Sequence, residues 1–230
     1  MALRQGRSCA HLHVHATRLF GPGAQGSFEC RRICPDAVVR RPRWTALRPR
    51  GRAAGRRGDQ MTEHIRDARR GDGDAIREVT LAAYQEYAAS MPALWNGYRQ
   101  NIVATLADVG PAEQLVAEHD GTIVGTVLLY PPRRLTSPQG DPIEMPWPEI
   151  RLLAVAPAAR GRGIGAALVQ ECVHRARRSG ALVLSLHTTD LMKTAMRMYA
   201  RMGFVRAPEL DFHPAPGLTV KGYRLDLAPA

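Results

Sequence analysis

One stretch constrains the fold of this chain more than any other, residues 149–167, which read E-I-R-L-L-A-V-A-P-A-A-R-G-R-G-I-G-A-A. The apolar run Ile150–Val155 is typical of a buried strand, and a proline follows it. The glycine-rich turn then leads into a helix with an apolar face formed by Ile164, Leu168 and Cys172. A strand, a glycine-rich turn and a helix in this order predict an α/β domain with a phosphate-binding loop.

The turn itself has the properties of an anion-binding site. The first turn of a helix presents unpaired N–H groups and the positive end of the helix dipole. Gly161, Gly163 and Gly165 let the backbone approach a pyrophosphate that a Cβ would push away. Arg160 and Arg162 add charge that can meet phosphate oxygens directly. We therefore expect a ligand that carries a diphosphate.

A dinucleotide is one candidate ligand, because Gly161-x-Gly163-x-x-Ala166 satisfies the fingerprint G-x-G-x-x-G/A. Two features argue against it. Residues 157–160 separate the turn from its strand, and the next expected strand, Leu182–Leu186, ends without the acid that would bind a ribose. The dinucleotide is therefore the weaker interpretation.

Two separated motifs resemble those of the GNAT superfamily of N-acyltransferases. Residues 153–165 resemble its acyl-CoA signature, whose core Q/R-x-x-G-x-G/A is met here by Arg160-x-x-Gly163-x-Gly165. The second motif is Ala195-x-x-x-Tyr199-x-x-x-Gly203-Phe204. The resemblance implies an α/β fold with a mixed, mostly antiparallel sheet of six to seven strands, splayed central parallel strands and about four helices.

The activity that this resemblance implies is N-acetyl transfer from acetyl-CoA to a primary amine, by direct attack without a covalent enzyme intermediate. A non-catalytic acyl-CoA-binding sensor or interaction module is the alternative. The acceptor, a small molecule or a peptide amine, is not identified by the sequence, nor is the acyl length. Dimers are frequent in the superfamily, so a homodimer is compatible with the resemblance.

The resemblance also assigns the residues that bind the coenzyme. The strand residues Leu153, Ala154 and Val155 are expected to lend backbone groups to the pantetheine arm. The turn is expected to hold the pyrophosphate through its N–H groups. Its residues are Arg160, Gly161, Arg162, Gly163, Ile164, Gly165 and Ala166. Relatives commonly carry Asn where this chain has Met192, so a polar contact with the coenzyme is in doubt.

Direct attack needs a deprotonated amine, a polarised carbonyl and a proton for the departing thiolate. Tyr199 matches the tyrosine that often supplies that proton in relatives, and the alternative is that it only packs. For the base we nominate Glu149, at the start of the motif strand, where relatives often use a carboxylate. His187 is the rival base, since an imidazole titrates near neutral pH.

Several aromatic residues of the first two expected helices are candidates for the acceptor pocket, although residues at helical spacing usually form core. They are Tyr84, Tyr87, Trp95 and Tyr98, and Trp147 in the following loop is a similar candidate. Cys172 lies on an apolar helix face and is interpreted as a buried filler.

The chain divides by charge into two parts. Residues 1–60 hold thirteen arginines and three acids, whereas residues 61–230 are nearly balanced. We expect a disordered extension at 1–60 and one N-acetyltransferase domain at 61–230. An over-long gene model, a basic tail for nucleic acid and an organelle presequence are the explanations left open for the extension.

The balanced charge of residues 61–230 argues against nucleic acid as a partner of the domain. No apolar stretch is long enough to span a bilayer, which predicts a cytoplasmic protein without a membrane partner. The group Cys9, His11, His13 and His15 fits no ligand spacing for zinc, and we expect no metal.

We expect the following elements along the domain. They are a strand at 64–69, helices at 71–89 and 92–106, strands at 114–118 and 122–130, a loop at 131–148, a strand at 150–155, a helix at 163–178, a strand at 182–186, a helix at 190–202, and strands around Phe204 and at 220–227.

Overall fold

The structure is a computed structural model that describes residues 64–136, 142–215 and 218–227. The extension predicted at 1–60, with its cysteines and histidines, lies outside the described residues.

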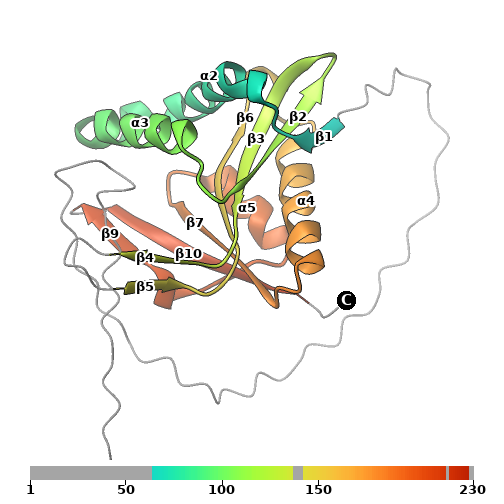
Figure 1. Cartoon of the computed structure of the whole chain (residues 1–230). Coiled ribbons are helices and arrows are strands. Elements are labelled where there is room, and N and C mark those ends of the chain that lie inside the picture. Colours follow the sequence, from blue (N-terminus) through green and yellow to red (C-terminus); the bar gives the residue numbers. More distant parts are fainter. Residues whose placement is uncertain (1–63, 137–141, 216–217, 228–230) are drawn as a thin grey trace, which may run out of the picture.

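A mixed sheet of eight strands forms the centre of the domain (Figure 1). Seven of them follow the order β1-β2-β3-β6-β7-β10-β8, and β9 pairs with β10. The strands are β1 (His64–Asp67), β2 (Glu113–His119), β3 (Thr122–Tyr130), β6 (Glu149–Val155), β7 (Val183–Thr189), β10 (Leu218–Asp226), β8 (Val205–Arg206) and β9 (Phe212–Ala215). All pairs are antiparallel except β6 with β7. The predicted fold class is confirmed, and β9 is the strand that the sequence analysis did not anticipate.

The parallel strands β6 and β7 stay paired only at their beginnings. The register joins Glu149 to Ser185 and Ile150 to Leu186, and no later pair is formed. Just beyond this point the backbone of Leu152 has a φ of 48°, and the pairing of β6 with β3 shifts register. A bulge of this kind bends a strand locally. The predicted splay of the two central strands is therefore confirmed.

Four α-helices cover the two faces of the sheet, among the residues that the structure describes. They are α2 (Gly73–Tyr84), α3 (Pro92–Ala107), α4 (Ile164–Arg178) and α5 (Lys193–Arg201). Short 3-10 turns add η1 (Arg70–Asp72), η2 (Gln85–Ser90), η3 (Pro157–Ala159) and η4 (Pro208–Leu210). Helices α2 and α3 lie on one side of the sheet and α4 lies on the other (Figure 1).

Alternation along β2 shows how the two faces are filled. Leu115 and Ala117 pack in the cluster that contains the apolar face of α4. Val116, which lies between them, packs instead with Ile76 and Val79 of α2. Successive side chains of a strand point to opposite faces, so a run of apolar residues indicates a strand that is buried on both sides.

The segment predicted as a loop at 131–148 differs from that prediction. It contains a separate antiparallel pair, β4 (Arg133–Thr136) with β5 (Pro142–Met145). Each of these two strands has only four residues, which is too few to show a clear period in the sequence. The prolines in the segment also favour the prediction of a loop. This hairpin matters for the site, because Arg133 lies on it.

Candidate functional site

The glycine-rich turn connects the end of β6 to the beginning of α4, as predicted. Gly161 has a φ of 80° and Gly163, the residue before the helix, has a φ of 89°. These left-handed conformations favour glycine. A Cβ placed on either residue would meet no heavy atom within 4 Å. The space above this backbone is therefore open to a ligand.

The N–H groups of the turn are available to that ligand. Within the described residues, no backbone carbonyl accepts from the N–H groups of 161–166. The first that is satisfied belongs to Ala167, which donates to the Gly163 carbonyl at 3.0 Å. A row of free N–H groups at the positive end of a helix suits a diphosphate. The turn therefore has the backbone geometry of a diphosphate-binding site.

Arg160 and Arg162 differ in what their side chains do. The guanidinium of Arg160 donates to the Ala83 carbonyl at 3.0 Å and to Oε2 of Glu86 at 2.8 Å. It thereby ties the turn to the end of α2 and to η2. Arg162 is exposed and forms no hydrogen bond or ion pair with any other described residue. Of the two, Arg162 is the one whose charge is free to meet a phosphate.

The strand residues assigned to the pantetheine arm alternate between the two faces of β6. Leu153 and Val155 pack toward the cluster on the α4 side. Ala154 is buried in the cluster with α2 and α3. These residues lie beyond the last β6–β7 pair, where the facing edge of β6 has no strand partner. Their backbone groups on that edge are therefore available for a bound chain.

Glu149 and His187 are joined by a hydrogen bond, Oε1 to Nδ1, at 2.8 Å. Glu149 is only 4% exposed, and its other carboxylate oxygen accepts from Nη2 of Arg133. Burial alone would raise the pKa of Glu149. The hydrogen bond and charge of His187, together with two neighbouring arginines, outweigh burial and lower the pKa to about 2. Glu149 is therefore a carboxylate at any pH near neutral.

The second ring nitrogen of His187 also has a partner, since Nε2 lies 3.0 Å from the Leu210 carbonyl oxygen. A carbonyl and a carboxylate are both acceptors. Both ring nitrogens of His187 therefore already have partners within the protein, so neither is free to bind an amine.

Two arginines that the sequence analysis did not select lie beside this pair. The guanidinium of Arg133 stands 4.3 Å from the centre of the Tyr130 ring, and that of Arg151 stands 5.6 Å from the same centre. Arg151 interrupts an apolar strand, which is a signal that could have been used. Arg133 gave no signal, because its segment was interpreted as a loop.

Tyr199 lies on α5 and is buried, with its ring centre 5.7 Å from that of Phe204. Burial raises its pKa, and Tyr84, Cys172 and Tyr87 add to the increase. The phenol is therefore protonated near neutral pH. The Tyr199 ring packs in the cluster on the α4 side of the sheet.

The aromatic residues of α2, η2 and α3 form one cluster. The ring centres of Tyr84 lie 6.1 Å from Tyr87 and 5.8 Å from Tyr98, and Trp95 lies 6.3 Å from Tyr98. Tyr84 and Tyr98 are buried, whereas Tyr87 and Trp95 are partly exposed. The core interpretation holds for the first two, and the partly exposed pair keeps the pocket interpretation.

Cys172 is fully buried, and burial raises the pKa of its thiol to about 12. It is a thiol rather than a thiolate near neutral pH, which agrees with the interpretation as an apolar filler.

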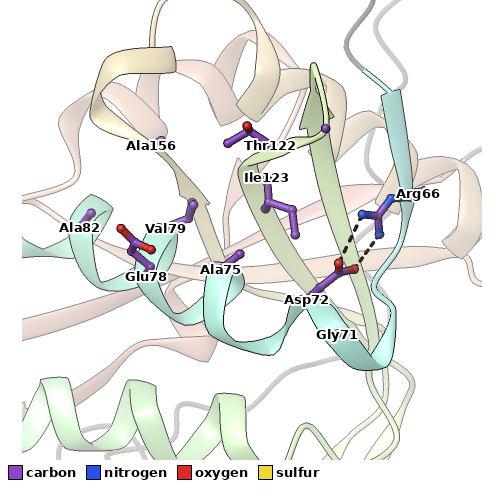
Figure 2. Close-up of a pocket in the computed structure, with 11 residues that line it drawn as sticks. Arg66, Gly71, Asp72, Ala75, Glu78, Val79, Ala82, Thr122, Ile123 and Ala156 are labelled. Carbon is purple, nitrogen blue, oxygen red and sulfur yellow. Dashed lines mark hydrogen bonds and ion pairs between the residues drawn. The ribbon is translucent and has the colours of Figure 1, made fainter.

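A separate open pocket of about 420 Å³ lies between α2 and the turn that joins β2 to β3 (Figure 2). Arg66 and Asp72 face each other across its rim in an ion pair of 2.6 Å. Asp72 also accepts from the N–H of Arg69 at 2.7 Å. Since these charged groups are already paired, this pocket is a weaker candidate site than the turn.

Two further observations concern metals and membranes. Among residues 64–136, 142–215 and 218–227, no group of three His, Cys, Asp or Glu side chains is placed to hold a metal ion. No described helix combines the length and the apolar character that crossing a bilayer requires.

Comparison with curated proteins finds acetyltransferases. The chain is 37% identical over 112 residues to the mycothiol acetyltransferase of Nocardia farcinica, a match of 47% of this chain and 31% of that protein. It is 30% identical over 112 residues to the N-alpha-acetyltransferase MAK3 of Arabidopsis thaliana, which covers 49% of this chain and 54% of that protein. The matched region thus spans about half of these relatives or less.

Comparison with solved structures agrees. A GNAT family acetyltransferase from Brucella melitensis in complex with acetyl-CoA has a TM-score of 0.50 at 27% identity, over 74% of this chain and 91% of that one. The PaiA N-acetyltransferase of Thermoplasma acidophilum in complex with coenzyme A has a TM-score of 0.55 at 16% identity, over 72% and 99%. The second likeness concerns the fold alone.

Residues 80–204, which include the turn, the parted strands and the second motif, match the sequence pattern of one family. That match covers more than half of the 230 residues. The chain therefore belongs to the acetyltransferase (GNAT) family.

Proposed function

We propose that this protein transfers the acetyl group of acetyl-CoA to a primary amine. The observation that carries the proposal is the row of free N–H groups from Gly161 to Ala166, at the start of α4 and beside the point where β6 and β7 part. These groups would bind the pyrophosphate, and the free edge of β6 at Leu153–Val155 would bind the pantetheine arm. Membership of the acetyltransferase family supports the same chemistry.

The reaction balances without a covalent enzyme intermediate. The amine nitrogen attacks the thioester carbonyl carbon, the C–S bond breaks, and the sulfur leaves as a thiolate that takes up a proton. The nitrogen loses one proton as the amide forms. The protein must therefore accept one proton near the nitrogen and give one near the sulfur.

Tyr199 is the proposed donor to the sulfur. Its phenol is buried and protonated, and its hydroxyl donates no hydrogen bond to another described residue. Burial raises the pKa of the phenol, and it also raises the pKa of a thiol that lies beside the phenol. The two increases offset each other, so burial does not by itself make proton transfer from Tyr199 to the thiolate less favourable.

Glu149 is the proposed group on the amine side. With a pKa of about 2 it is a weak base, so it does not hold the proton. It attracts the ammonium form of the acceptor, which loses one proton to solvent through water before the attack. The second proton, which the nitrogen loses as the amide forms, leaves by the same route, while His187 and Arg133 fix the position of the carboxylate. His187 is then a positioning residue, since both of its nitrogens are engaged.

The direct test mixes the purified full chain with acetyl-CoA and a panel of primary amines and follows the release of free thiol. Amine-dependent thiol release, with the acetylated amine identified by mass spectrometry, supports the proposal. Binding of coenzyme A without turnover on any amine would favour the acyl-CoA sensor. Absence of coenzyme A binding in calorimetry would refute both.

A further inference from the structure

The strongest unexplained feature of the molecule is a surplus of positive charge beside Glu149. The guanidinium groups of Arg133 and Arg151 both lie on the Tyr130 ring, and Arg133 also forms an ion pair with Glu149. Glu149 carries one negative charge, and both of its oxygens already have partners in Arg133 and His187. Arg151 forms no hydrogen bond or ion pair with any described residue. Arg151 acts on Glu149 only through its charge, so one guanidinium has no hydrogen-bonded counter-ion among the described residues.

Arg151 lies where an acceptor would have to enter under the proposed function. It follows directly after Ile150, the last residue of β6 that pairs with β7. Residues two apart on a strand share a face, so Arg151 and Glu149 lie on the same face, with Cα atoms about 6.6 Å apart. Ile150, which lies between them, packs in the cluster that contains the apolar face of α4, so Glu149 and Arg151 lie on the opposite face, which α2 and α3 cover (Figure 1).

A second donor on the same face also lacks a partner. Nη1 of Arg133 is buried and has no hydrogen-bond acceptor, while Nη2 of the same group is bound to Glu149. A buried donor without a partner costs free energy, which a ligand can recover by accepting from it. Each of the two guanidinium groups on the Tyr130 ring keeps free N–H groups, and a guanidinium with free N–H groups suits a planar carboxylate.

We infer that the acyl acceptor is an amine that also carries a carboxylate, which Arg151 binds while the amine faces Glu149. This inference rests on the proposed function, and it narrows the acceptor to amino-acid-like molecules. The positive group of such a molecule meets the one carboxylate of the site, and its negative group meets the unpaired guanidinium. A plain alkylamine would leave Arg151 unpaired.

The test compares amines in matched pairs that differ only in the charge of the second group. Glycine, β-alanine and phenylalanine are each assayed against their amides, with the wild-type chain and acetyl-CoA. The acids should be acetylated with a kcat/KM about 10- to 100-fold above that of the amides, the range expected for a charge-assisted hydrogen bond. Replacing the carboxylate by an amide lowers the pKa of the amine, so the amides have more of the reactive, unprotonated form. A preference for the acids would therefore be opposite to the order of intrinsic amine reactivity.

The variant Arg151→Gln should remove most of this preference by raising KM for the acids, with a much smaller change for the amides. Arg151→Lys should restore part of the preference, since lysine keeps the positive charge but cannot donate two parallel hydrogen bonds to a carboxylate. Arg134→Gln is the matched control, because Arg134 on β4 is exposed and pairs with Glu144. It makes the same change of charge and should keep the preference.

The possible failures are distinguishable. If amines are acetylated and the acids show no advantage over their amides, the inference is wrong and the proposed function stands. If O-phosphoethanolamine gains over ethanolamine while the carboxylates gain nothing, the assignment to a carboxylate is overturned. If no amine at all is acetylated, the proposed function itself fails.

Discussion

Nδ1 of His187 lies 2.8 Å from Oε1 of Glu149, so the two residues that the sequence offers as rival bases form one hydrogen-bonded pair. The register explains the contact. Glu149 is paired with Ser185 in the short parallel ladder, and His187 is the next residue along β7 on the same face. The pair is closed on one side by Arg133 and on the other by the Leu210 carbonyl. Together, these contacts hold the Glu149 carboxylate and the His187 ring in fixed positions at the point where β6 and β7 part.

The first prediction concerns how this buried carboxylate contributes to stability. The pKa of Glu149 is lowered from 4.5 to about 2 in the folded chain. Because the folded pKa is the lower one, the contribution is fully present above about pH 4.5 and is lost as the pH falls toward 2. Glu149→Gln should reduce the free energy of unfolding by about 2 to 4 kcal/mol at pH 7.

Urea denaturation of wild type and Glu149→Gln at pH 7, 5 and 3 measures this difference. It should be equal at pH 7 and 5 and much smaller at pH 3. Glu144→Gln, which removes an exposed carboxylate paired with Arg134, should cost less than about 1 kcal/mol at every pH. A Glu149→Gln difference that does not change between pH 7 and 3 would contradict the lowered pKa.

The parts of the fold that could be predicted are those in which a residue type is required locally. Gly161 and Gly163 adopt left-handed conformations that other residues avoid, so the turn can be recognised from its glycines. Pro92 begins α3, because proline is favoured in the first turn of a helix. Gly203 has a φ of 90° and follows the end of α5, where glycine is favoured because the backbone is left-handed. The continuous apolar runs in β2 and β3 likewise follow from burial on both faces of the sheet.

The parts that could not be predicted depend on contacts between distant segments. Arg133 reaches Glu149 only because the hairpin of β4 and β5 holds it there, and that hairpin has too few residues to show a period. Arg160 looks like a phosphate ligand in the sequence, yet its guanidinium is bound to Glu86, far away along the chain. Local patterns determine backbone shape, whereas the partner of a long charged side chain depends on packing.

The second prediction tests Tyr199 as the proton donor. Tyr199→Phe removes the hydroxyl and keeps the ring against Phe204, so kcat should fall by about 10- to 10³-fold with little change in the Kd for coenzyme A. Tyr223→Phe removes a hydroxyl from another buried tyrosine and should leave kcat near the wild-type value. Unchanged turnover in Tyr199→Phe would reduce its role to packing.

The third prediction tests the turn as the phosphate site. Gly163 and Gly180 have similar left-handed φ values, 89° and 77°, and a Cβ on either meets no neighbouring atom. Alanine at either position should therefore cost about 1 to 2 kcal/mol of stability. Only Gly163 lies among the free N–H groups, so only Gly163→Ala should raise the Kd for coenzyme A, by about tenfold or more. Calorimetric titration of both variants decides the matter, and an equal loss of affinity would show that strain alone is responsible.

The last prediction separates the two arginines of the turn by their response to salt. Arg162 is exposed and has no described partner, so its contribution to coenzyme A binding should come from direct attraction to phosphate. Raising the salt from 0.05 to 0.5 M shortens the range of that attraction to a few ångströms, and the defect of Arg162→Ala should shrink accordingly.

Arg160 acts instead by holding the turn against the Ala83 carbonyl and Glu86. Its ion pair is half-exposed and contributes only about 0.2 to 1 kcal/mol, so most of its effect lies in the position of the backbone. The defect of Arg160→Ala should therefore persist at 0.5 M salt, and a defect that disappears there would make Arg160 a phosphate ligand like Arg162.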